Sequence, residues 1–353
     1  MAWPLLAGGT VSLAALYLAF RNVPLAELGA CLARVEYRYL FLSLAVVTGL
    51  QVLKAQRWRL ILGATVRVGF TSAFHPMMIG FMLNCILPGR PGELARPLIL
   101  GRRQAIPFAT ALSTVVAERI LDTVTILALL AWVLGALDLA TAEAIDFAGY
   151  RIDGALVVSA GRATLALALA LLAGVGLLRL EPVQRWIKAL IHRLPLWIPG
   201  IAPRRRQWLI ERVSRPLSAL VDQAVQGLAM VGRPLRLAAC IGLSLAIWLL
   251  TACSFYILSL GFPGIDLTLV QMTAVMVVIC FCIALPSVPG WWGLWEAGGI
   301  FALSLMGIPP GPAAGFTLVN HAAQVFPVIL IGLGSALISG VGVRRIVKTA
   351  RQV

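Results

Sequence analysis

The chain has 353 residues, of which 60% are hydrophobic and 12% are charged. A soluble domain is about half apolar and about a quarter charged, so this composition excludes an ordinary soluble fold. The net charge of +15 does not indicate a nucleic-acid-binding protein, because Lys and Arg lie at the ends of apolar blocks and in one central loop. We therefore expect membrane lipids, and no nucleic acid, as partners.

Six apolar blocks are long enough to cross a bilayer as helices. A helix rises about 1.5 Å per residue, so about 20 residues cover the hydrocarbon layer. The alternating pattern of a transmembrane β-barrel is absent, so we predict an all-α polytopic membrane protein. No basic residue precedes the first block, which favours a retained span over a cleavable signal. The expected spans lie near residues 3–20, 38–54, 106–135, 155–178, 236–260 and 313–340.

Two further apolar stretches, 70–100 and 267–306, are interrupted by several Pro and Gly residues. Broken backbone at membrane depth persists only where it is buried in protein or lines a cavity. We therefore predict two re-entrant helical hairpins. Their central segments, Ile86–Glu93 and Ala284–Glu296, both contain Leu-Pro, then Pro-Gly, then a Glu, which suggests an internal repeat.

The basic loops predict the orientation. The linker 179–236 carries eleven Lys or Arg, and the tail after Val343 and the segment after the second span are also basic. The positive-inside rule places all three in the cytoplasm, with both termini, so the first hairpin opens to the cytoplasm and the second to the opposite face. The halves 1–137 and 138–353 then form an inverted repeat, as in many transporters. The linker is either an interfacial amphipathic segment or an ordinary basic loop.

The first cluster of candidate residues lies in the first hairpin and includes Asn84 and Arg90. Glu93 and Arg96 are three residues apart, so one helix face can hold both charges. A helix that begins after Pro91-Gly92 would direct free N–H groups and a positive dipole end at a phosphate or another anionic headgroup. The alternative is a Glu–Arg pair that only locks a bent hairpin.

The second cluster comprises Glu118, Arg119 and Asp122 in the span 106–135, near the middle of the bilayer. Arg119 and Asp122 are spaced to form a pair, which leaves one negative charge. Glu118 is then protonated or meets an arginine from elsewhere, and Arg90 and Arg96 are the nearest candidates. A purely structural ion network is the alternative.

The third cluster lies in the second half of the chain. Trp292 and Glu296 are expected to share a helix face, although tryptophans here also suit an interfacial belt. Asn320, His321 and Gln324 should face the bundle interior, where His321 would either relay protons or pack with a hydrogen bond. No His, Cys or acidic group has metal-ligand spacing, so we expect no metal and no cofactor.

These motifs resemble the lysylphosphatidylglycerol synthase/flippase transmembrane-domain family. Its members share Arg-Trp after the second span, a Pro-Gly-Arg-x-Gly-Glu-x-x-Arg-like hairpin, Glu-Arg-x-x-Asp in the next span and a late Pro-x-x-Pro-Gly…Glu segment. The corresponding residues are Arg57-Trp58-Arg59, Pro88–Arg96, Glu118–Asp122 and Pro286–Glu296, with Trp291-Trp292 where smaller residues are usual.

The resemblance implies translocation of a polar lipid between leaflets, as in the aminoacyl-phosphatidylglycerol flippases, with relatives linked to hopanoid lipids and glycolipid pathways. The soluble aminoacyl-transferase domain of two-function members is missing, so aminoacyl transfer is not expected. The implied location is a bacterial cytoplasmic (inner) membrane.

Three functions fit the sequence. In a lipid translocase, which we favour, movement would follow a lipid gradient or an ion or proton gradient, with Glu93, Glu118 and Asp122 as proton carriers, because no nucleotide-binding motif is present. The alternatives are a membrane-embedded transferase acting on a lipid-linked substrate, with Glu93 or Glu118 as its base, and a scaffold that recruits a lipid-synthesising enzyme through the linker 179–236. A homo-oligomer is compatible with each.

Overall fold

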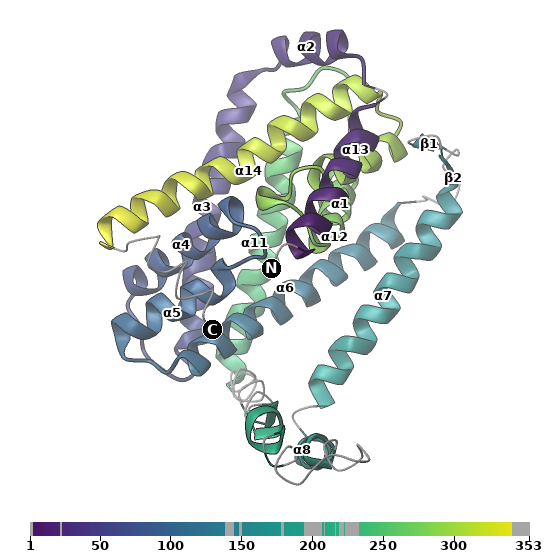
Figure 1. The fold of residues 1–353 in the computed structure, drawn as a ribbon. Helices are drawn as coiled ribbons and strands as arrows, with labels where there is room; N and C mark the ends of the chain where they lie inside the picture. The colour runs from purple at the N-terminus through teal and green to yellow at the C-terminus, as the bar shows by residue number, and fades with distance from the viewer. Residues whose placement is uncertain are drawn as a thin grey trace.

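The computed structural model describes residues 3–21, 23–137, 145–147, 150–177, 180–193, 207, 209–215, 217–218, 222 and 233–340. These residues form a bundle of helices (Figure 1), with one short antiparallel hairpin of β1 (Ile145–Phe147) and β2 (Tyr150–Ile152). The predicted basic tail lies outside the described residues, as does most of the linker. The prediction of an all-α polytopic membrane protein is confirmed.

Each of the six predicted spans is a helix. Four of them, α3, α6, α11 and α14, are long and apolar enough to cross a membrane, and α1 and α7 contain the shorter apolar stretches Gly9–Phe20 and Gly154–Ala170. The bounds are α1 (Trp3–Phe20), α3 (Tyr37–Leu62), α6 (Phe108–Ala136), α7 (Gly154–Leu177), α11 (Pro234–Ser259) and α14 (Pro310–Ile338).

The helix α3 continues two turns beyond its predicted end near residue 54. Arg57 and Trp58 are therefore inside the helix and fully buried, not in a basic loop that follows it. The predicted end was wrong because Arg57 does not anchor the helix at the membrane surface. Buried carboxylates from another helix neutralise Arg57, so its charge does not end the buried segment.

Both predicted hairpins consist of a helix, a break and a second helix that packs against the first. The first is α4 (Phe70–Ile86) followed by α5 (Gly92–Gln104), and the second is α12 (Leu269–Ala284), the 3₁₀ turn η5 (Pro289–Trp291) and α13 (Leu294–Leu305). A Cβ on Gly92 would lie 1.8 Å from the Gly80 carbonyl oxygen, so the helices α4 and α5 meet backbone to backbone. The faces to which the hairpins open stay a prediction.

The breaks of the two hairpins meet. Arg90, in the first break, donates a hydrogen bond of 2.5 Å to the Ile283 carbonyl near the end of α12. A Cβ on Gly290, in the second break, would lie 3.2 Å from the Cys85 carbonyl of α4. The two interrupted segments therefore contact each other and form one joint.

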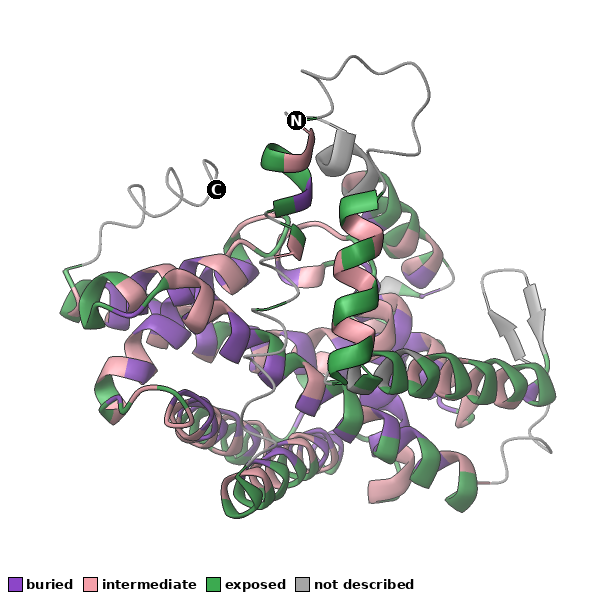
Figure 2. Cartoon of the chain, turned by 90° about the horizontal axis from the view of Figure 1, so that it is seen from below, coloured by how far each residue is buried: buried purple, intermediate pink, exposed green. Residues whose placement is uncertain are grey.

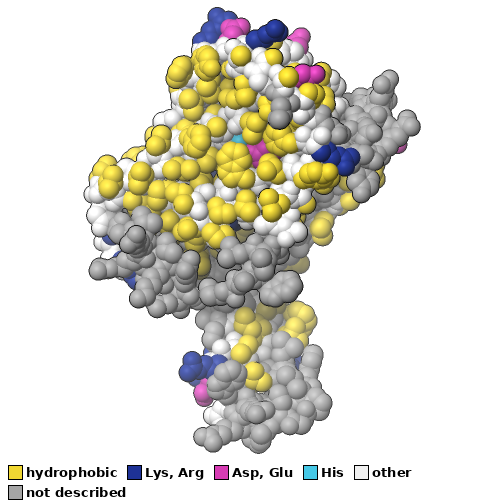
Figure 3. Space-filling view, turned by 45° about the horizontal axis from the view of Figure 1, so that its top comes forward, with side chains coloured by type: hydrophobic (Ala, Val, Ile, Leu, Met, Phe, Trp, Pro, Cys, Tyr) yellow, Lys and Arg dark blue, Asp and Glu magenta, His cyan; other side chains and the backbone are white. Residues whose placement is uncertain are grey.

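The buried residues lie along the helices that surround this joint, whereas α7 is largely exposed (Figure 2). Helix α14 packs against α4, α13, α3 and the short helix α2 (Leu25–Ala33), and α11 packs against α3 and α6. Large apolar side chains such as Leu13, Phe41 and Leu337 are exposed. Hydrophobic side chains gather over the upper, described part of the face in Figure 3, and an exposed apolar surface of this kind suits contact with lipid.

Part of the central linker forms α8 (Glu181–Arg193) and the π-helical turn η3 (Ile210–Ser214). Helix α8 is strongly amphipathic and has no buried residue, and Trp186 on it is 66% exposed. Lys188 pairs with Asp222. These features favour an interfacial segment over an ordinary loop, although its place at a membrane surface stays a prediction.

Candidate functional site

The centre of the site is one face of α6, where two carboxylates lie one turn apart. Glu118 is 1% exposed and Asp122 is 8% exposed, inside a helix long and apolar enough to cross a membrane. Charged groups at such depth are costly and are usually paired and functional. The partners of these two carboxylates therefore define the site.

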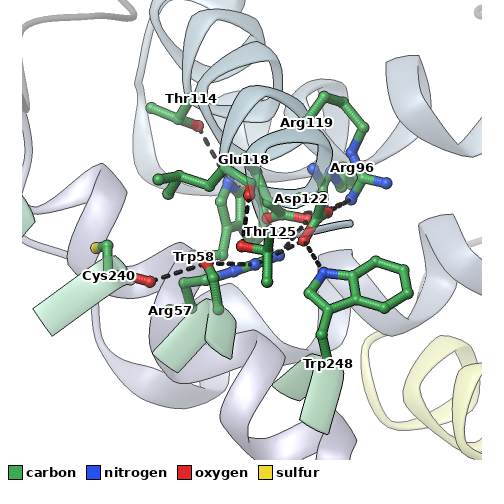
Figure 4. A network of polar contacts seen from close by, with 12 residues as sticks. Arg57, Trp58, Arg96, Thr114, Glu118, Arg119, Asp122, Thr125, Cys240 and Trp248 are labelled. Carbon is green, nitrogen blue, oxygen red and sulfur yellow. Dashed lines mark hydrogen bonds and ion pairs between the residues drawn. The ribbon is translucent and has the colours of Figure 1, made fainter. Parts of the chain in front are cut away.

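Three arginines surround Glu118 (Figure 4). Arg96 Nη1 donates hydrogen bonds of 3.1 and 3.3 Å to its two carboxylate oxygens, and Arg119 Nη2 donates one of 2.5 Å. Arg57 Nη2 lies 3.7 Å from Oε1. Of the two alternatives for Glu118, a proton or an arginine from elsewhere, the structure shows the arginine: Arg96 from α5, one of the two candidates, pairs with it, and Arg57 lies nearby.

Asp122 joins the same network through its other neighbours. Arg57 Nη1 donates a hydrogen bond of 2.7 Å to Oδ1, and Trp248 Nε1 on α11 donates one of 3.1 Å to the same oxygen. Arg119 Nη2 lies 3.2 Å from Oδ2, which confirms the predicted pair. Two arginines and one indole thus hold this carboxylate.

Arg57 belongs to the site, although the sequence indicated it only as part of the family motif and not as a candidate site residue. Its Nη1 also donates to Ser244 on α11 at 2.8 Å, so it links α3, α6 and α11. A signal was present: Arg57 follows Leu50 and precedes Ile61 at the spacing of a buried helix face. An arginine on an apolar stripe indicates a buried ion pair more strongly than a loop anchor.

Glu93 and Asn84 extend the network to the first hairpin. Glu93 Oε2 lies 3.8 Å from Arg96 Nη2, which confirms the predicted pair, and Asn84 donates to Glu93 Oε1 at 3.4 Å. Arg96 also lies over the Trp58 ring, with 5.0 Å from its guanidinium carbon to the ring centroid. Three arginines (57, 96 and 119) and three carboxylates (93, 118 and 122) therefore balance in charge.

The expectation of free N–H groups at the start of α5 is wrong, because these groups already have acceptors. Asn84 Oδ1 accepts from Gly92 N at 2.7 Å, and the next three N–H groups bond to the carbonyls of Arg90 and Pro91. The break is tight enough for the chain to cap its own helix. An anion in this conformation would meet side chains rather than the helix end.

Part of the network remains accessible and incompletely bonded. Arg119 exposes 46% of its side chain and Glu93 exposes 26%. Arg96 Nε and Nη2, Arg57 Nε and Glu93 Oε2 have no hydrogen-bond partner among the described residues. A buried polar group without a partner costs about 1–3 kcal/mol, so these atoms favour a polar ligand in this place.

Two more cations lie beside the balanced network. Lys54 on α3 lies over the Phe81 ring at 5.9 Å, and Arg90 donates to the Ile283 carbonyl. Neither forms an ion pair within the part of the chain that the structure describes. The first hairpin and its surroundings therefore carry excess positive charge.

The second hairpin holds a separate polar group. His321 Nδ1 lies 2.6 Å from Glu296 Oε1, and both side chains are fully buried. Trp295 stacks on the imidazole at 4.7 Å, and the Trp292 ring lies 4.5 Å away. The expectation that Trp292 shares a helix face with Glu296 is wrong, because α13 begins at Leu294 and Trp292 belongs to the break.

The other two predicted residues of α14 stand apart from this pair. Gln324 donates a hydrogen bond of 2.9 Å to Ser254 on α11. Asn320 is fully buried, as predicted, but neither atom of its amide has a partner among the described residues. Within the same residues, no group of His, Cys, Asp and Glu side chains is arranged to hold a metal ion.

Comparison with known proteins gives two levels of similarity. Residues 5–332 match the family described as the lysylphosphatidylglycerol synthase TM region. A UPF0104 membrane protein of Methanothermobacter thermautotrophicus is 24% identical over 331 residues, which are 93% of this chain and 92% of that protein.

A second relative is longer than this chain. The glycosyltransferase AglD of Haloferax volcanii is 26% identical over 321 residues, 85% of this chain but 49% of that protein. The chain therefore spans about half the length of this relative. No solved structure matches the chain.

Proposed function

We propose that this chain, which belongs to the lysylphosphatidylglycerol synthase TM region family, is a lipid translocase that moves a polar or anionic lipid between bilayer leaflets. The observation that carries the proposal is the buried network of three arginines and three carboxylates that joins α3, α5, α6 and α11. Intramembrane charges of this kind usually mark a substrate or ion pathway.

The charge around the network supports an anionic headgroup. The network itself is balanced, and Lys54 and Arg90 add two positive charges. A phosphate or carboxylate would complete hydrogen bonds that Arg96 and Arg57 leave open. The headgroup would enter beside Arg119 and Glu93, the two partly exposed members, while the acyl tails stay in the surrounding lipid.

The joint between the hairpins supplies the element that would move. A hydrogen bond from Arg90 links the breaks on the Ile283 side. In transporters with broken helices, one repeat rocks or gates against the other around the site. In this proposal both termini and the linker 179–236 lie in the cytoplasm. The halves 1–137 and 138–353 form an inverted repeat with hairpins open to opposite faces of a bacterial inner membrane.

A membrane-embedded transferase is the second candidate, because one relative is named a glycosyltransferase. That name belongs to a protein of which the chain covers 49%, so the activity can reside in the other half. In this alternative Glu93 would act as the base, since its Oε2 has no hydrogen-bond partner among the described residues.

The test is lipid exchange in liposomes that contain the purified protein and an acyl-chain-labelled phosphatidylglycerol or phosphatidylethanolamine. We expect the wild type to equalise the label between leaflets. Glu93→Gln should slow this exchange at least about tenfold, which corresponds to a rise of about 1.4 kcal/mol in the barrier. Glu36→Gln is the control, because Glu36 forms an exposed pair with Arg38.

Three results would contradict the translocase or the role of the network in it. No exchange of either lipid by a folded wild type would favour the transferase, which a product assay with lipid-linked sugars would then detect. If Glu93→Gln and Glu118→Gln both exchanged lipid as fast as the wild type, the network would have only a structural role. If only changes in the linker 179–236 impaired lipid synthesis in cells, the chain would be a scaffold for a lipid-synthesising enzyme.

A further inference from the structure

A buried pair, Glu296 and His321, holds the second hairpin in place, and its hydrogen bonds require a fixed number of protons. His321 Nδ1 lies 2.6 Å from Glu296 Oε1, and His321 Nε2 lies 2.7 Å from the Gly290 carbonyl oxygen. The other carboxylate oxygen of Glu296 accepts from Gly293 N at 2.7 Å. Three hydrogen bonds therefore join α14, α13 and the break between α12 and α13.

Hydrogen-bond chemistry assigns one shared proton to the pair. The Gly290 carbonyl can only accept, so Nε2 carries its hydrogen. Nδ1 and Glu296 Oε1 then hold one proton between them, as imidazolium with carboxylate or as imidazole with carboxylic acid. Both forms have zero net charge, which suits a fully buried position.

Any change in proton number breaks the arrangement. Without the shared proton, the carboxylate faces the lone pair of Nδ1. With a second proton, the O–H of Glu296 and the N–H of His321 face each other as two donors. Either state removes the 2.6 Å bond and leaves a buried charge. The pair therefore stabilises the observed position of the second hairpin only when it holds one proton.

The pair acts directly on the broken backbone. Gly290 and Gly293 have φ of 71° and 89°, conformations that need glycine, and each is bonded to the pair. Gly293 also packs on the backbone of Ser12 in α1, and Gly290 on that of Cys85 in the first hairpin. Loss of the pair's hydrogen bonds therefore loosens the segment that contacts the first hairpin.

No other described charge competes for this proton. No residue besides the two partners forms an ion pair with Glu296 or His321 in the described part of the chain. The elements packed against α13 and α14 carry other titratable or charged groups, which include Tyr17 on α1, Asp146 on β1, Cys280 and Cys282 on α12, His75 and Cys85 on α4, Lys54 and Arg57 on α3, Cys253 and Tyr256 on α11, and Glu27 and Cys31 on α2.

We propose that Glu296 and His321 form a proton-binding site whose occupancy biases the second hairpin between two positions. The proton is then the coupling ion of lipid movement, a role that rests on the proposed translocase function. The site itself does not depend on that function, because its proton exchange can be measured without any lipid substrate.

The variant Glu296→Gln removes the shared proton but can keep the hydrogen bonds that hold the hairpin. The amide N–H of Gln can donate to Nδ1 of a neutral imidazole, and its carbonyl can still accept from Gly293 N. All three hydrogen bonds then persist, but no shared proton remains. His75→Gln is the matched control, because His75 is a half-buried histidine that contacts Ser335 on the same helix α14 at 3.2 Å.

The first experiment measures the steady-state ratio of labelled phosphatidylglycerol between leaflets under a pH difference of one unit, with the membrane potential clamped at zero. One proton per lipid predicts a ratio displaced about tenfold from unity in the wild type and in His75→Gln. Glu296→Gln should leave the ratio near one. A wild type that exchanges lipid but keeps a ratio of one, or a Glu296→Gln variant displaced like the wild type, overturns the coupling.

The second experiment detects the proton itself by ¹⁵N nuclear magnetic resonance of the histidine side chains. The chain has three histidines, so single substitutions assign the signals. We expect the His321 ring nitrogens to report a proton shared between Nδ1 and Glu296 in the wild type, and a neutral imidazole protonated on Nε2 alone in Glu296→Gln. A wild-type His321 signal identical to that of Glu296→Gln overturns the proton site, whereas a shared proton without lipid exchange refutes only the translocase.

Discussion

The two hairpins share a helix–break–helix backbone but differ in how they hold polar groups. The first hairpin contributes Glu93 and Arg96 to a network of six charges on α3, α5 and α6. This network is linked to α11 through Ser244 and stays partly accessible. The second contributes Glu296 to one closed pair with His321, which is fully buried. The comparison indicates a division of work: the open network suits a headgroup, and the closed pair suits a proton.

The largest expected loss of stability comes from removing Arg57, the buried arginine of the network. Arg57→Ala leaves Asp122 and Glu118 without one of their shared cations, and breaking a buried pair costs about 3–5 kcal/mol. The free energy of unfolding of the purified protein in detergent should fall by about this amount. Arg38→Ala, which removes an exposed pair, should change little. Equal stability of the two variants would show that Arg57 is not part of a tight network.

A smaller loss of stability is expected when Trp248, whose indole N–H donates to Asp122, is replaced. Trp248→Phe removes the hydrogen bond of 3.1 Å to Asp122, and a bond to a charged group contributes about 1.5–3 kcal/mol. The same unfolding measurement applies. Trp132→Phe on the exposed side of α6 is the control. If both variants lose the same amount, the effect is one of aromatic packing and not of the bond to Asp122.

The glycines of the two breaks test whether both hairpins need close backbone contact. A Cβ at Gly92 would lie 1.8 Å from the Gly80 carbonyl oxygen, and one at Gly293 would lie 2.2 Å from that of Ser12. Each substitution by Ala should destabilise the protein by about 1–3 kcal/mol, since a packed interior resists added atoms. Gly49→Ala, with no atom within 4 Å of the added Cβ, should not destabilise it.

The smallest effect concerns the anchor of the second break. Ser12 Oγ accepts from Val288 N at 3.0 Å, so Ser12→Ala should cost about 1 kcal/mol. Ser159→Ala on the exposed helix α7 is the comparison, because Ser159 bonds only within its own helix. Hydrogen exchange at Val288 should rise in the first variant alone. Unchanged protection of the Val288 N–H would show that the hydrogen bond from Val288 to Ser12 on α1 does not hold the second break in place.

Local spacing explains which parts of the site the sequence could predict. The Glu93–Arg96 and Arg119–Asp122 pairs follow from residues three apart on a helix, and the spans and breaks follow from apolar length and from Pro and Gly. The contact of Arg57 with Asp122 joins residues 65 apart, and that of Glu296 with His321 joins residues 25 apart. Their partners depend on how the helices pack, which no single segment determines.

The most direct test of the account compares one variant from each hairpin in the same liposomes. Leaflet exchange of labelled phosphatidylglycerol is measured for the wild type, Glu93→Gln and Glu296→Gln, with and without a pH difference. The account predicts that Glu93→Gln loses exchange in both conditions, whereas Glu296→Gln keeps exchange at equal pH and loses the response to the gradient. Identical behaviour of the two variants would contradict the division between headgroup and proton.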